Sequence, residues 1–164
     1  NNKNFQIINK KSKKMNFKEF EKLLKKNQNQ VFLFNSKCHF PAWFATHPWF
    51  VTSNKGKISR YEIKHEKNGK YQYLQINKRP PVQGLEIFFG IKKIKWNSKL
   101  LGITEGKTAD KIINILKKTP TEYPYKKIYK FAGPNSNTFA QWIINKVPKT
   151  NFELPKNAIG KNWK

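Results

Sequence analysis

The stretch from residue 42 to residue 76 constrains the fold more than any other part of the chain, because turn signals divide it into strand-like runs. The runs are 42–52, 58–66 and 70–76, separated by SNKGK (53–57) and by the hairpin signal Asn68-Gly69. They predict three antiparallel strands. Pro48 lies inside the first run and cannot donate a hydrogen bond to a sheet, so we expect that strand to lie at a sheet edge or to be bulged there.

The remaining apolar patterns predict helices and further strands. Residues 15–26 place Phe17, Phe20, Leu23 and Leu24 on one helical face. A second helix is expected over 108–118, ended by Thr119-Pro120, and a third runs from Ser136 to about Val147, before Pro148. Short strands are expected at 31–34, 91–96 and 126–131. The predicted fold class is α+β, with an antiparallel sheet packed on helices.

Size and composition indicate one globular domain. The chain of 164 residues is long enough for one hydrophobic core, and aromatic residues make up 15% of it. Residues 1–14 are polar and basic, so we expect a flexible segment there and a single α+β domain over 15–164. The chain begins without an initiating Met, so we expect either that a signal peptide or anchor preceded it or that the sequence was trimmed at its start. A monomer is expected.

Several chemical classes find no support in the sequence. A single cysteine, Cys38, excludes an internal disulfide and a multi-cysteine zinc site. The three histidines, His39, His47 and His65, lack a metal-ligand spacing, so no metal is expected. Neither a dinucleotide fingerprint nor a P-loop occurs, and no cofactor is expected. No stretch approaches the roughly 18 apolar residues that cross a bilayer.

The charge is the strongest compositional signal. Thirty-four basic and nine acidic residues give a net charge of +25, and only Arg60 and Arg79 among the basic residues are not lysine. Such an excess attracts polyanions: anionic lipid, acidic envelope polymers or, less expected here, nucleic acid. The alternative is a charged surface that is solvated and has no partner.

Ser136, in the segment GPNSNTFAQWIINKVP (133–148), admits two interpretations. Asn and Ser at the start of a helix accept hydrogen bonds from its first free N–H groups, so Ser136 can be an N-cap. A serine at a helix N-terminus that faces a histidine can also be a nucleophile. The sequence leaves both interpretations open.

His47 is the candidate general base. It shares a strand side with Trp43 and Trp49, where it is either a core histidine or a base shielded by aromatic rings. If the following hairpin turns about Lys55, Tyr61 shares its face, whereas a register shifted by one residue substitutes Glu62. The orienting residue is therefore Tyr61 or Glu62, with His65 a poorer choice.

The order of histidine before nucleophile resembles the circularly permuted branch of the papain-like superfamily, which includes lecithin:retinol acyltransferase and is related to NlpC-type peptidases. That branch carries N-C-x-x-F at the start of a helix, and residues 135–139 read NSNTF, with Ser136 at the cysteine position. The resemblance implies a permuted papain-like, NlpC-like core. It also implies a hydrolase or acyltransferase of amide or ester bonds, in which serine depends more strongly on its base than cysteine does.

A closer resemblance is to a bacterial family catalogued as domain of unknown function 3750. Its members share segments like A-x-H-x-W, R-Y-E, G-P-N-S-N-T-F and L-P-x-x-A-I-G-K, found here at 45–49, 60–62, 133–139 and 154–161. The resemblance implies a set of site positions and a location in the cell envelope. We expect Ser136, His47 and Tyr61 or Glu62 to be catalytic. Within the same motifs, the expected binding residues are Asn135, Asn137, Trp49 and Lys161. The alternative function is a basic module that binds an anionic surface without catalysis.

Overall fold

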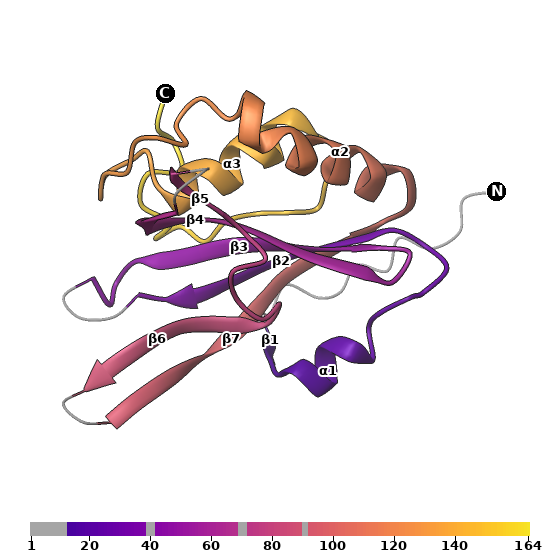
Figure 1. The fold of residues 1–164 in the computed structure, drawn as a ribbon, viewed down its shortest axis with the longest axis horizontal. Helices are drawn as coiled ribbons and strands as arrows, with labels where there is room; N and C mark the ends of the chain where they lie inside the picture. The colour runs from indigo at the N-terminus through magenta and orange to yellow at the C-terminus, as the bar shows by residue number, and fades with distance from the viewer. Residues whose placement is uncertain (1–12, 39–41, 69–71, 90–91) are drawn as a thin grey trace.

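The fold of the chain is seen in a computed structural model that describes residues 13–38, 42–68, 72–89 and 92–164 (Figure 1). The strands are β1 (Lys13–Met15), β2 (Gln30–Lys37), β3 (Thr46–Asn54), β4 (Lys57–Asn68), β5 (Gln72–Ile76), β6 (Gln83–Phe89) and β7 (Lys92–Glu105). The helices are α1 (Phe17–Glu21), α2 (Gly106–Glu122) and α3 (Ser136–Lys146). Every recorded strand pair is antiparallel, so the predicted α+β class with an antiparallel sheet is confirmed.

The sheet is open and has the strand order β1-β7-β2-β3-β4-β5. The predicted meander of three strands corresponds to β3, β4 and β5. The long strand β7 has three neighbours: residues 92–97 pair with β6, residues 98–100 pair with β1 along one edge, and residues 99–105 pair with β2 along the other. One short strand was expected at 91–96, and the β6–β7 hairpin takes its place.

The turn between β3 and β4 fixes the register on which the site depends. Lys55 and Gly56 both have positive φ, 49° and 89°, as a two-residue type I′ turn requires. Asn54 therefore pairs with Lys57, and Phe50 pairs with Tyr61. Of the two registers that the sequence leaves open, this is the one shifted by one residue from a turn centred on Lys55. Within the described residues the β3–β4 pairing stops at Phe50–Tyr61, although both strands continue beyond it.

The two faces of the sheet carry separate apolar clusters. Helices α2 and α3 cover one face and α1 lies on the other (Figure 1). Phe50 faces α3, where its ring meets that of Phe139 with centroids 6.3 Å apart. Alternation along β3 sends Trp49 to the opposite face, where it stacks on Phe34. Pro48 pairs with Asn35 of β2, and it lies in the part of β3 that β4 has left, which is a local edge.

Helix α2 continues past the expected stop at Thr119-Pro120 and ends at Glu122. Proline lacks the N–H that would bond to the carbonyl four residues earlier, at Leu116. The buried Thr119 hydroxyl donates to that carbonyl instead, at 2.7 Å. Lys126 Nζ donates to the carbonyls of Pro120 and Thr121 at the end of the helix. The carbonyl groups are thus satisfied locally and the helix tolerates its proline.

The first helix is shorter than the 15–26 segment predicted for it. Asn16 caps α1 in a capping box with Glu19, and Met15 belongs to β1. Gln30 ends the helical region because its side chain bonds to the backbone on both sides of the turn: Nε2 donates to Leu23 O and Oε1 accepts from Lys25 N. Of the segment expected to be flexible, residues 1–12 lie outside the described part, and Lys13 and Lys14 belong to β1.

The strand expected at 126–131 is wrong, because the segment forms turns. Lys130 N donates to Pro134 O and Gly133 N donates to Lys130 O, which folds the chain back before α3. A single backbone bond, from Tyr73 N to Lys126 O, links this segment to β5. Among the described residues, no helix combines the length and the apolarity needed to span a membrane.

Candidate functional site

A cavity of about 650 Å³ lies where β3 and β4 part beyond the Phe50–Tyr61 pair. Both strands contribute to its wall, together with the segment before α3 and the start of α3. Its lining includes Cys38, Thr46, His47, Lys64, His65, Glu66, Arg79, Glu86, Tyr129, Phe131, Asn135, Ser136, Asn137 and Ile159. The cavity therefore brings together His47 and Ser136, which are 89 positions apart in the chain (136 − 47).

Ser136 is the first residue of α3 and is not its cap. The N-cap is Asn135, whose Oδ1 accepts from Asn137 N at 2.9 Å and from Thr138 N at 3.3 Å. The interpretation of Ser136 as a cap is therefore wrong, and its hydroxyl has no capping duty. With the Phe139 N–H bonded to Asn135 O, the Ser136 N–H is the amide of the first turn of α3 that has no partner among the described contacts.

The residues that flank Ser136 hold the site together. Asn135 Nδ2 donates to the carbonyls of Phe131 and Ile159, and Asn137 Nδ2 donates to the carbonyls of Thr46 and Ile159. These bonds tie the start of α3 to the start of β3 and to the segment around Ile159. Their donor groups are thus used internally, and the structure gives Asn135 and Asn137 a positioning role. Substrate binding by these two residues stays a prediction.

Thr138 and Gly160 add to these bonds between the start of α3 and the segment around Ile159, which together form a clasp. Thr138 Oγ1 donates to Gly160 O at 2.7 Å and accepts from the Asn135 N–H, which completes the capping box. Gly160 has a φ of 85°, and a Cβ on it would lie 2.6 Å from Asn135 Nδ2. Only glycine fits this close approach in this backbone conformation. The closing motif of the chain is therefore a structural partner of the α3 N-terminus.

His47 is held by a buried carboxylate. Its Nε2 lies 2.9 Å from Glu62 Oε2, and both side chains are buried. Tyr61 instead faces the core with Phe50, and burial raises its pKa. Of the two expected orienting residues, the shifted register therefore brings Glu62 to His47. The catalytic roles of His47, Glu62 and Tyr61 stay predictions.

Glu62 also pairs with Arg60 on the same side of β4. Arg60 Nη2 donates to Glu62 Oε2 at 2.9 Å, and both side chains are 1% exposed. Arg60 Nη1 donates to the carbonyls of Pro80 and Gln83, and the guanidinium lies 4.4 Å from the Trp49 ring centre. Burial alone would raise the Glu62 pKa, but His47 and Arg60 outweigh it and hold the pKa at about 2.

We expect this network to make stability sensitive to acid. The Glu62 pKa is lower in the folded chain than in the unfolded chain, where it is about 4.3, so folding favours the carboxylate. The resulting stabilisation, roughly 3 kcal/mol, is complete above the unfolded pKa and is lost as the pH falls towards 2. Urea unfolding of wild type and Glu62→Gln across this range measures it, and the variant should lack this loss.

Glu105→Gln is the matched control, because Glu105 is a surface carboxylate paired with Lys25 and Gln30. Its pKa is also lowered, by those hydrogen bonds and despite partial burial, but solvent screens the pair. This variant should retain most of the wild-type acid dependence. An equal loss in both variants would contradict the assignment to Glu62.

Two of the expected binding residues lie away from the cavity. Trp49 is fully buried, and its Nε1 donates to Pro81 O. It supports His47, on which it stacks, and Arg60. Lys161 donates to Pro155 O and lines a second, shallower hollow with Trp163. A direct contact with a ligand in the main cavity is therefore not indicated for either residue.

Tyr129 and Arg79 are cavity residues that the sequence interpretation missed. Burial and nearby Cys38 raise the pKa of Tyr129, and its interaction with the Ser136 side chain opposes them. Tyr129 was assigned to a strand that does not exist. Arg79 was noted only as one of two arginines, and its Nη1 is buried without a partner among the described residues.

Cys38 lines the same cavity, but its thiol is expected to be a weak nucleophile. Burial raises the pKa of its thiol to about 11, so at neutral pH the nucleophilic thiolate is rare. In the described part of the chain, no group of three or more His, Cys, Asp and Glu residues is placed to hold a metal ion.

The sequence model of a family described as "Protein of unknown function (DUF3750)" matches residues 28–163. The chain belongs to this family. The DUF3750 region begins just before β2 and includes every residue of the cavity, whereas β1 and α1 lie outside it. No significant match was found among curated proteins or among solved structures.

Proposed function

We propose that this DUF3750 protein is a hydrolase or acyltransferase acting on amide or ester bonds. Ser136 is the nucleophile, His47 the general base and Glu62 the residue that orients it. The observation that supports the proposal most is the shared cavity: a serine free of capping duty and a histidine fixed by a buried carboxylate line one space of about 650 Å³. Among the described contacts, His47 Nδ1 has no partner, so this nitrogen is available to accept a proton.

The proposed reaction follows from these positions. Ser136 Oγ attacks the carbonyl carbon and passes its proton to His47 Nδ1, directly or through one water, while Glu62 holds Nε2–H. The Ser136 N–H and the positive end of α3 stabilise the oxyanion. His47 then returns the proton to the leaving amine or alcohol. Water, or another alcohol or amine, resolves the acyl-enzyme to acid or to transferred acyl product.

We further propose that the arrangement is a permuted papain-like core and that the protein works in the cell envelope. The support for the core is the order of the chain: His47 on β3 precedes the nucleophile at the start of a helix. His47 alternates away from Phe50, whose ring meets that of Phe139 on α3. The two side chains therefore approach the cavity from different sides of the sheet end, and a bridging water suits this geometry.

A serine-directed fluorophosphonate probe tests the reaction. We expect the probe to label wild type and the Cys38→Ala variant equally well. The Ser136→Ala and His47→Ala variants should not be labelled. Glu62→Gln should slow labelling by roughly tenfold or more, because the histidine tautomer is no longer fixed. Mass spectrometry of the labelled peptide locates the adduct. Labelling that survives in Ser136→Ala would place the nucleophile elsewhere.

The second candidate is a basic module that binds an anionic polymer or surface without catalysis, and the net charge of +25 favours it. Its attraction acts through many lysines and counterion release, so it weakens steeply with salt. Wild type that resists every fluorophosphonate, yet binds anionic polymers in this salt-dependent way, would support the module and contradict the hydrolase.

A further inference from the structure

Three large aromatic side chains are exposed beside one another. Trp43 is 63% exposed, Phe44 47% and Phe131 56%. The rings of Trp43 and Phe44 lie 6.1 Å apart between centroids, and those of Phe44 and Phe131 also lie 6.1 Å apart. These three residues, the aromatic rim, come from two segments distant in sequence. A contiguous exposed patch of this kind indicates an interaction surface, whereas scattered apolar residues do not.

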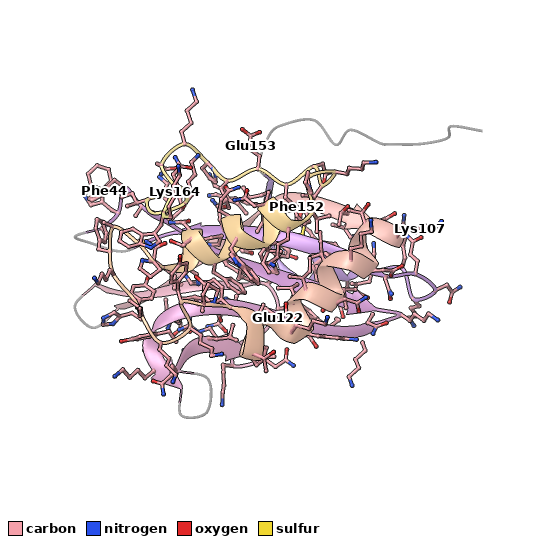
Figure 2. The ribbon with its side chains drawn as sticks, turned by 90° about the horizontal axis from the view of Figure 1, so that it is seen from above. Phe44, Lys107, Glu122, Phe152, Glu153 and Lys164 are labelled. Carbon is pink, nitrogen blue, oxygen red and sulfur yellow. The ribbon has the colours of Figure 1, made fainter. Side chains whose placement is uncertain are left out.

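The aromatic rim borders the candidate active site. Phe131 lines the cavity, and Trp43 and Phe44 lie between two other lining residues, Ala42 and Ala45. Figure 2 places Phe44 at one end of the molecule along its long axis, with Lys107 at the other. Whatever covers the aromatic rim therefore lies at the mouth of the cavity.

Lysine residues lie near the aromatic rim. Lys130 precedes Phe131 and is exposed. Asn157 Nδ2 donates to Phe44 O at 2.8 Å, which brings the segment with exposed Lys156 beside the rim. Lys164 lies at the same end of the molecule as Phe44 in Figure 2. The surroundings of the rim thus share the cationic character of the chain, whose net charge is +25.

We propose that the aromatic rim docks the protein onto an anionic membrane surface, with Trp43 and Phe44 inserted among the lipid headgroups. Tryptophan and phenylalanine favour the interface between headgroups and acyl chains, and lysines near the surface add attraction to anionic lipids. A protein partner would not require the surrounding positive charge. Docking in this orientation turns the mouth of the cavity towards the bilayer. The proposal stands whether or not Ser136 is a nucleophile.

The test compares two variants of the full chain with equal charge. Trp43→Ser/Phe44→Ser removes most of the rim but no residue that lines the cavity, and Phe17→Ser removes a side chain that is equally exposed, 47%, on α1. The vesicles contain phosphatidylcholine with about a third of phosphatidylglycerol. Co-sedimentation measures binding, and quenching of tryptophan fluorescence by acyl-brominated lipid measures insertion.

We expect wild type and Phe17→Ser to bind and to be quenched alike. The rim variant should bind at least about tenfold more weakly and lose the quenching, because only electrostatic adsorption remains. The proposal would be overturned if the rim variant bound as well as wild type, or if both variants lost binding equally. It would also be overturned if wild type did not bind the vesicles. A rim-dependent dimer in solution would overturn it as well, because it would show that a second copy covers the patch. Fluorophosphonate labelling without vesicles reports separately on the proposed reaction.

Discussion

A cysteine introduced by Ser136→Cys should react with iodoacetamide at neutral pH at least about a hundredfold faster than Cys38 does. The two sites differ in what surrounds the sulfur. Burial raises the Cys38 pKa to about 11, so about one thiol in ten thousand is ionised there at neutral pH. The introduced thiol would stand at the positive end of α3 and line a cavity with His47, and both favour the thiolate. Alkylation rates in a Cys38→Ala background measure it without interference.

The control for this experiment is stability. Because Asn135 caps α3, Ser136→Cys should leave the free energy of unfolding nearly unchanged, whereas Asn135→Ala should lower it by about 1 kcal/mol or more. Adding His47→Ala separates the helix from the imidazole and should slow the alkylation. An introduced thiol that small reagents reach, yet that reacts at the rate of an ordinary cysteine, would contradict the nucleophile assignment.

Arg60→Ala should cost about 3 to 5 kcal/mol of stability, the largest loss expected for one substitution here. The change leaves the Glu62 carboxylate buried with His47 alone and removes the donor to the carbonyls of Pro80 and Gln83. It also removes the guanidinium stacked on Trp49. Urea unfolding at neutral pH measures the loss.

Lys118→Ala is the matched control, because Lys118 forms an exposed ion pair with Glu122 on α2. Such pairs contribute about 0.5 kcal/mol, so this variant should remain close to wild type. Similar losses in the Lys118 and Arg60 variants would show that the Arg60–Glu62 pair contributes no more than a surface pair. A variant too unstable to purify would agree with the expected cost, and Arg60→Lys, which keeps the charge, should then recover part of the stability.

The sequence was informative where local chemistry decides the structure. Alternation and turn signals were sufficient for the β3–β4–β5 meander, and the spacing of Phe139 and Ile143 was sufficient for α3. Register was harder, because a one-residue shift exchanges Tyr61 for Glu62 and depends on Lys55 adopting positive φ beside Gly56. Sequence alone does not determine that choice for a lysine.

Several remaining errors arise from side-chain hydrogen bonds to the backbone, which residue type alone does not predict. Gln30 shortens α1 from across a loop, and the Thr119 hydroxyl lets α2 continue through Pro120. In the site, Asn135 and Ser136 are both acceptable caps by residue type, and only the backbone decides between them. Tyr129 lies in a segment without strand structure, and its apolar neighbours led to the wrong prediction of a strand there.

The clasp between the α3 N-terminus and the carbonyls of Ile159 and Gly160 also orders events during biosynthesis. Asn135 Nδ2 needs an acceptor 24 positions further along the chain, and Thr138 needs one 22 positions further along. A ribosome-bound chain can form the sheet and α3 before those acceptors emerge from the exit tunnel. The wall around Ser136 is complete only once Gly160 has left the tunnel, so a shorter nascent chain holds Ser136 in an unfinished cavity.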